Sequence, residues 1–147
     1  MKKILMLLLA SISVGFTANA QSCEVEDIWL EHNVYQSGYK GMKIHSEFTV
    51  DDCEGKTIQC CAYFFNEDGY PIAAPYGAPS YCKTRDGQLC TGTNSYVKYE
   101  SSYWDDFVLF IPNGMFAPGS YQCIVQISLL DGTILGLSDT EYFSVSR

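Results

Sequence analysis

The chain is poor in basic residues and in histidine, and after its first twenty residues it has no long apolar run. It contains nine Lys and Arg residues against 17 Asp and Glu residues, and only two histidines. An acidic protein is poorly suited to bind nucleic acid or anionic lipid, because both carry negative charge. No later apolar run approaches the roughly 20 residues of a membrane-spanning helix. We therefore expect neither a nucleic-acid partner nor a membrane span.

Motifs of metal and enzyme chemistry are also missing. The sequence has no C-x-x-C or H-x-x-x-H pair of the kind that binds zinc, and no G-x-S-x-G turn that would carry a catalytic serine. It also lacks a D-x-D-x-D-G calcium loop. We expect no catalytic residue, no metal and no cofactor. A calcium ion between two acidic loops stays open as an alternative, since carboxylates are paired at Asp51-Asp52, Glu67-Asp68 and Asp105-Asp106.

The first twenty residues have the pattern of a secretory signal peptide. A basic pair precedes the apolar run Ile4–Ala10, and Ala18-Asn19-Ala20 forms a small-residue cleavage site. We expect the mature chain to begin at Gln21 and to form one domain over residues 21–147, secreted to the periplasm or outside the cell. The alternative is a lipid anchor on Cys23, for which the preceding residues are a weak signal.

All seven cysteines lie after this segment. In an oxidising compartment disulfides form and persist, and an odd number leaves at least one thiol unpaired. Cys82 and Cys90 flank Asp86-Gly87, a tight-turn dipeptide, almost symmetrically. Opposed residues across such a hairpin have the Cα spacing that a disulfide requires, so we predict a Cys82–Cys90 bridge.

The remaining cysteines allow two further pairings. Cys60 and Cys61 are neighbours in a predicted strand, so their side chains should point to opposite faces. We expect the core-facing one to meet Cys123 and the outer one to meet Cys53. Cys23 is then the remaining thiol, which is free, lipidated or bridged to another molecule.

The periodicity of the sequence predicts strands throughout. In residues 42–50, Met42, Ile44, Phe48 and Val50 alternate with polar residues, so one face should be core and the other solvated. This places Lys43 and His45 on the solvated face, and we assign them no function. Residues 57–65 form a nearly continuous apolar run, typical of a central strand. Further strands are expected around Trp29 and over residues 106–111, 121–130, 133–137 and 141–145.

This pattern predicts an all-β protein, an antiparallel two-sheet β-sandwich of immunoglobulin-like type with seven or eight strands, stabilised by disulfides. Several segments carry a further resemblance: Trp29, His32-Asn33, Gly41–His45 with Phe48, Gly55-Lys56, Ala62–Phe64, Asp68-Gly69 with Pro71-Ile72, and Tyr103 with Asp106–Pro112. Together they resemble uncharacterised secreted β-sandwich modules of Gram-negative bacterial exported proteins. The resemblance implies the fold and no catalytic residue.

Aromatic residues cluster in the irregular middle of the chain, among Gly, Ser, Pro and Asn. The cluster consists of Tyr70, Tyr76, Tyr81, Tyr96, Tyr99, Tyr103 and Trp104. Loops of this composition on a rigid sandwich are typical of binding surfaces, because tyrosine offers both an apolar ring and a hydroxyl. The alternative is that the rings form a small core beneath a long loop.

Three functions are consistent with these features. The first is a non-enzymatic secreted module that binds a cell-envelope protein, a host protein or a glycan through the loops around residues 70–104. The second is a structural or assembly module without a ligand site. The third is a small hydrolase whose catalytic groups the sequence does not reveal.

Overall fold

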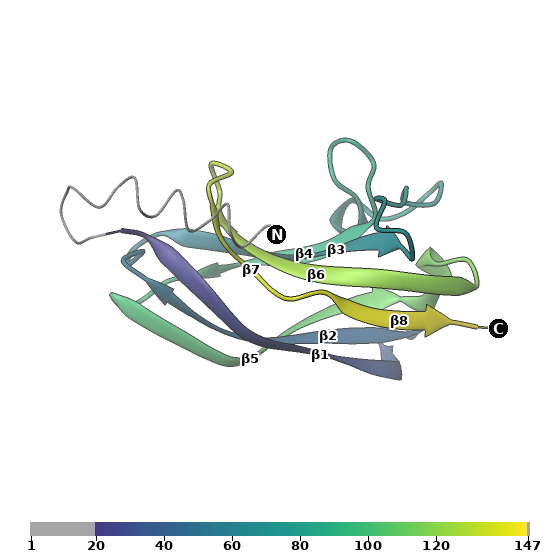
Figure 1. Cartoon of the computed structure of the whole chain (residues 1–147), viewed down its shortest axis with the longest axis horizontal. Coiled ribbons are helices and arrows are strands. Elements are labelled where there is room, and N and C mark those ends of the chain that lie inside the picture. The colour runs from purple at the N-terminus through teal and green to yellow at the C-terminus, as the bar shows by residue number, and fades with distance from the viewer. Residues whose placement is uncertain (1–19, 147) are drawn as a thin grey trace.

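The computed structural model describes residues 20–146, and the predicted signal peptide lies outside this range except for Ala20. The described chain is built of strands joined by turns and two short 3-10 turns, η2 and η3 (Figure 1). No described helix is long and apolar enough to cross a membrane. The elements are β1 (Ser22–Gln36), β2 (Tyr39–Asp51), β3 (Thr57–Asn66), η2 (Ser80–Cys82), β4 (Cys90–Tyr96), β5 (Ser101–Pro112), η3 (Asn113–Met115), β6 (Gly119–Leu129), β7 (Ile134–Leu137) and β8 (Glu141–Val145).

The strands form two antiparallel sheets, as the alternation predicts. Sheet A has the order β1-β2-β5, and sheet B has the order β4-β3-β6-β7. The last strand, β8, pairs with the first half of β6, whereas β7 pairs with its second half. β7 and β8 therefore act as one interrupted edge strand. The two sheets lie as two layers over each other (Figure 1).

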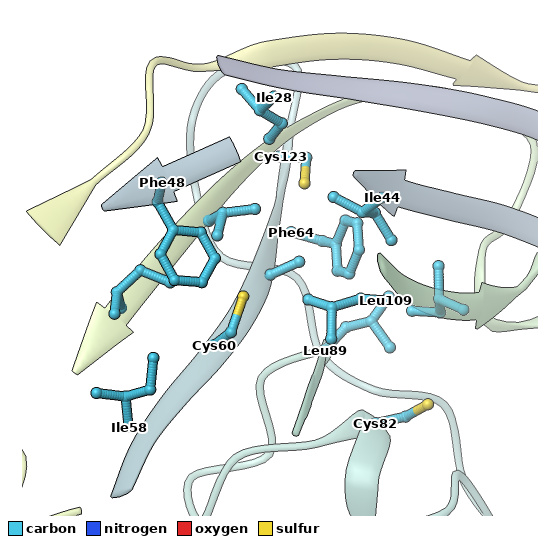
Figure 2. Close-up of a cluster of buried hydrophobic side chains, with 14 of the residues drawn as sticks. Ile28, Ile44, Phe48, Ile58, Cys60, Phe64, Cys82, Leu89, Leu109 and Cys123 are labelled. Atoms are coloured by element: carbon cyan, nitrogen blue, oxygen red, sulfur yellow. The ribbon is translucent and has the colours of Figure 1, made fainter. Parts of the chain in front are cut away.

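The core fills the space between these layers. Ile44 and Phe48 of β2 face Phe64 of β3 and Val125 and Ile127 of β6, and all five side chains are fully buried (Figure 2). Phe64 packs edge-on against Phe116 and Phe143, with ring centroids 5.1 and 6.0 Å apart. Because β-branched and aromatic side chains occupy every second position, each sheet contributes one apolar face to the core.

The sheets also meet at their edges. At one edge the Thr91 hydroxyl of β4 donates a 2.8 Å hydrogen bond to the Phe110 carbonyl of β5. At the other edge Gly136 of β7 lies against the Cys23 backbone of β1, where a side chain on residue 136 would collide with it. The second edge requires glycine because two backbones approach closely.

Two predictions about local structure were incomplete. The Cys82–Cys90 segment is not a regular strand hairpin. The 3-10 turn η2 occupies residues 80–82, and the Asp86-Gly87 turn is closed by an isolated bridge between Lys83 and Leu89 and by a 2.9 Å hydrogen bond from the Thr84 amide to the Gln88 carbonyl. In addition, β4 and the start of β5 lie in a stretch for which no strand was predicted. Thr, Asn, Ser and Gly dominate β4, so it has no apolar alternation, and its pairing with β3 is what holds it extended.

Candidate functional site

The connection between β3 and β4, residues 67–89, is an ordered segment that we call the tyrosine loop. It is held by isolated β-bridges between Phe65 and Pro71 and between Ala73 and Gln88. Backbone hydrogen bonds of 2.8 Å join Ala74 to Gly87 and Leu89 to Ile72. Its buried side chains, Ala78, Cys82 and Leu89, belong to the core cluster. The loop is therefore packed against the sandwich, and its conformation is fixed by contacts with it.

Three of the predicted binding residues lie on this loop with their rings in solvent. Tyr70 is 68% exposed, Tyr81 is 50% exposed and Tyr76 is fully exposed. Tyr39, at the start of β2, lies within electrostatic range of Tyr81 and is also exposed. These rings do not form a small core beneath the loop. The tyrosine loop that carries the first three of them rises at one end of the sandwich (Figure 1).

The other predicted residues lie elsewhere. Tyr96 pairs with Thr57 at the start of β3, whereas the tyrosine loop follows the end of that ten-residue strand. A strand of this length spans roughly 30 Å, so the predicted cluster is divided between the two ends of the sandwich. Tyr99 and Tyr103 lie with Tyr96 at the second end and are exposed. The register of β3 and β4 therefore places the predicted residues at both ends of the sandwich.

Trp104 packs against the core, unlike the exposed tyrosines. It is partly buried and stacks on Phe48 with ring centroids 4.9 Å apart. The neighbouring Tyr103 points outward, and its hydroxyl donates a hydrogen bond to Glu47. This bond raises the pKa of Tyr103 to about 12. Alternation along β5 thus assigns one of these neighbours to the core and the other to solvent.

A polar cluster on the outer face of sheet A was not foreseen as a site. His45 of β2 lies between two carboxylates, with Nδ1 2.7 Å from Asp106 Oδ1 and Nε2 3.0 Å from Glu31 Oε1. Its ring stacks on Trp29, with centroids 5.1 Å apart and planes 8° apart. We call Trp29, Glu31, His45 and Asp106 the histidine cluster. Both ring nitrogens therefore lie within hydrogen-bonding distance of a carboxylate oxygen.

The sequence assigned His45 to the correct face but to the wrong environment. It faces outward, as predicted, yet it is only 9% exposed because side chains of β1 and β5 cover it. Alternation within one strand reveals the face of a residue, but its cross-strand neighbours depend on register. The sequence signal for this cluster was the presence of Trp29 and Glu31 two residues apart on one strand, and therefore on one face. This signal indicates a site only once the pairing of Trp29 with His45 is known.

The seven cysteines are free thiols, and none lies at bonding distance from another. Cys60 faces the core and Cys61 the outer face of sheet B, as predicted. Cys60 is nevertheless opposite Ile127, and Cys123 is opposite Phe64. The four-residue offset separates Cys60 from Cys123 by roughly 13 Å along the strand, so their predicted bridge is excluded (Figure 2).

The other two predicted bridges are absent for different reasons. Cys53 is buried on the core side, with Cys23 as an electrostatic neighbour, so sheet B separates it from Cys61. Cys82 is turned by η2 toward the core cluster, whereas Cys90 lies outside that cluster. The thiol that hydrogen-bonds to Cys90 is that of Cys61. Cys23 is itself half-buried against the core.

A pocket of about 140 Å³ lies at the same end of the sandwich as the tyrosine loop. His32, Asn33, Asn113 and Phe143 are among its lining residues, and the Asn113 side chain donates to Asn33 Oδ1 at 3.4 Å. None of the predicted tyrosines lines it. Within residues 20–146, no group of three or more His, Cys, Asp or Glu side chains is arranged to hold a metal ion.

Comparison with known proteins adds no relative to this description. No protein-family model matches the chain, and a search of curated proteins gives no significant match.

Proposed function

We propose that this protein is a secreted, non-enzymatic module that binds a protein or a glycan through its tyrosine loop. The observation that carries the proposal is the exposure of Tyr70, Tyr76 and Tyr81 on a segment whose backbone is tied to the sandwich. Rings held outward on an ordered backbone lose little conformational entropy on binding. Each ring packs on an apolar surface and leaves its hydroxyl free for a polar contact.

The contacts of the two His45 ring nitrogens support a binding module over a hydrolase. Both of its ring nitrogens contact carboxylates, so neither is free to take a proton from a serine or threonine hydroxyl. The partner is a cell-envelope protein, a host protein or a glycan. Because the chain has a formal net charge of −8, a neutral or basic partner surface fits best.

Export with cleavage after Ala20 is part of the proposal. Ser22 is the first residue of β1, so cleavage before Gln21 leaves the whole sandwich intact. Cys23 is half-buried and packs against the core, which supports a secreted product over a lipid anchor, since an acyl chain on Cys23 would disturb that packing. Mass spectrometry of the native protein is expected to find Gln21 at the N-terminus, and an acylated Cys23 would overturn this assignment.

We also assign the sandwich to the immunoglobulin-like class. The order β1-β2-β5 against β4-β3-β6-β7 supports this, because it corresponds to A-B-E facing C-F-G with β4 added beside strand C.

The test of function compares two sets of three exposed tyrosines. One variant carries serine at residues 70, 76 and 81, and the matched control carries serine at residues 96, 99 and 103. Both variants and the wild type are applied to a glycan array and used to capture partners from the native envelope. We expect the first variant to lose binding by at least about 10-fold, since several aromatic contacts are worth more than 1.4 kcal/mol. The control variant should bind as the wild type does.

Equal loss in both variants, or loss in the control alone, would contradict the proposal. No binding by the wild type on either test would favour the structural or assembly module. Thermal unfolding of each variant should match the wild type, because all six side chains are exposed.

The histidine cluster favours a second candidate, a glycan site on the outer face of sheet A. β1 is the edge strand, and His45 covers the β2 side of the Trp29 ring, so the other ring face is directed toward the edge. Glu31 and Asp106 supply acceptors beside it. An aromatic face flanked by carboxylates suits a sugar. Trp29→Ala should then abolish array binding, whereas Tyr142→Ala, which removes an exposed ring from sheet B, should not.

A further inference from the structure

Cys61 and Cys90 are a pair of thiols on the outer face of sheet B. Cys61 pairs with Gly92 and Cys90 pairs with Tyr63, so the two cysteines are diagonal neighbours on one face of β3 and β4. Their side chains hydrogen-bond to each other. They are 5% and 6% exposed, so surrounding side chains shield them almost completely. The other side chain in the group is Tyr63, whose hydroxyl hydrogen-bonds to Cys61.

Gly92 makes this arrangement sterically feasible. A Cβ atom on residue 92 would lie 3.0 Å from Cys61 Sγ, closer than side chains tolerate. Because glycine has no Cβ, the Cys61 sulfur lies close over Gly92 of β4, the strand that carries Cys90. The absence of a side chain opposite Cys61 therefore leaves room for its sulfur beside β4.

The pKa values of the two thiols are shifted in opposite directions. The hydrogen bond from Cys90 lowers the pKa of Cys61, with a further contribution from Tyr63, and these outweigh burial. The same hydrogen bond raises the pKa of Cys90. A thiol of lowered pKa beside a thiol of raised pKa is the combination that a sulfur nucleophile and its resolving partner require.

No other cysteine of the described chain has this environment. Burial is the largest effect on Cys23, Cys53, Cys60, Cys82 and Cys123, and it raises the pKa of each. Cys82 is the nearest competitor for Cys90, but its pKa is about 11 and its side chain belongs to the core cluster.

We propose that Cys61 and Cys90 are the oxidisable dithiol of this protein, with Cys61 attacking a small hydroperoxide and Cys90 resolving the product to a disulfide. The Cys61 thiolate attacks one peroxide oxygen, the O–O bond breaks, and hydroxide leaves, giving sulfenic acid on Cys61. The Cys90 sulfur then attacks the Cys61 sulfur, the S–O bond breaks, and the Cys90 proton leaves with the hydroxyl as water. The two sulfurs lose two electrons and the peroxide gains them.

The experiment treats the fully reduced protein with hydrogen peroxide, blocks the remaining thiols with N-ethylmaleimide and sequences non-reduced peptides by mass spectrometry. Since Cys60 and Cys61 are adjacent, a parallel set in the Cys60→Ala background identifies which of them is bridged. We expect a Cys61–Cys90 cross-link in the wild type and in Cys82→Ser. Cys90→Ser should instead accumulate sulfenic acid on Cys61, detected with dimedone, and Cys61→Ser should give neither product.

Three results would overturn the proposal. One is a Cys82–Cys90 cross-link in the wild type, and another is dimedone labelling of a cysteine other than Cys61 in Cys90→Ser. The third is a mixed disulfide as the main and faster product when glutathione disulfide replaces hydrogen peroxide, because a bulky oxidant would then reach the pair.

A positioning role for Tyr63 gives a second, independent readout. Tyr63→Phe removes one hydrogen bond to the thiolate and keeps the ring. We expect the pH at which oxidation reaches half its maximal rate to shift upward in this variant and to stay unchanged in Tyr99→Phe, an exposed ring distant from the pair. An unshifted midpoint in Tyr63→Phe would contradict attack by the hydrogen-bonded Cys61 thiolate.

Discussion

The two faces of β3 place the same chemical group in opposite environments. Cys60 points into the apolar core, where burial raises its pKa to about 12. Cys61, the next residue, points to the outer face, where hydrogen bonds lower its pKa despite similar exposure. Both side chains are hidden from solvent, so burial alone does not decide the behaviour of a thiol. The decisive difference is the set of hydrogen-bond partners, which for Cys61 are Cys90 on β4 and Tyr63 on β3 itself.

The largest expected effect tests whether the inner face carries the stability. Ile127 of β6 is fully buried opposite Cys60, whereas Ile124 lies half-buried on the outer face opposite Tyr63. Ile127→Ala should lower the free energy of unfolding by about 2–5 kcal/mol, because it leaves a cavity. Ile124→Ala should cost less than about 1 kcal/mol. Urea denaturation of both variants measures the contrast, and equal losses would mean that the outer face is as tightly packed.

The next effect compares a buried and an exposed hydrogen bond. Thr91→Val removes the donor to the Phe110 carbonyl at the edge where the sheets meet, and we expect a loss of about 1–3 kcal/mol. Tyr103→Phe removes the exposed donor to Glu47 and should change stability by less than about 0.5 kcal/mol. Thermal unfolding of the two variants gives the comparison. A larger loss in Tyr103→Phe would reverse the assigned order.

The effect that is smallest near neutral pH is a change in the pH dependence of stability. The pKa of Cys60 is raised from 9.0 to about 12, so its contribution is complete below pH 9 and is lost as pH rises toward 12, where the unfolded chain ionises first. Cys60→Ala should therefore reduce the alkaline loss by up to about 1.4 kcal/mol per pH unit.

Cys61→Ala provides the matched comparison. The pKa of Cys61 is lowered, so the stabilisation from its thiolate is present above pH 9 and is lost as pH falls through that lowered pKa. Deleting Cys61 should remove the gain in stability as pH rises toward 9, whereas Cys60→Ala should keep that gain. Urea midpoints between pH 8 and 11 measure the alkaline slope of Cys60→Ala, and midpoints between pH 7 and 9 compare the two variants. An equal gain toward pH 9 in both variants would contradict the assigned environments.

Much of the fold was predictable because alternation is a local property. The pattern of Met42, Ile44, Phe48 and Val50 identified β2 and its buried face, and the apolar run 57–65 identified a central strand. The opposite orientation of Cys60 and Cys61 followed from the same geometry. β4 was missed because its extended form depends on pairing with β3 rather than on its own residues.

The contacts of the candidate sites depended on register and could not be read from the chain. A shift of two residues in the register of β3 and β4 would move Cys61 away from Gly92. A similar shift between β1 and β2 would separate His45 from Trp29. The division of the predicted tyrosine cluster is a further case, since Tyr76 and Tyr96 are near in sequence and lie at opposite ends of a strand.

The sequence by itself therefore determined most of the strands and the face of each side chain along them. Only the tertiary structure decided which cysteines face each other, what surrounds His45 and which aromatic rings share a surface. The physical reason is that the two-residue period of one strand sets the direction in which a side chain points. Which side chains become its neighbours is set by the pairing of separate strands. That pairing is fixed by packing of the whole core.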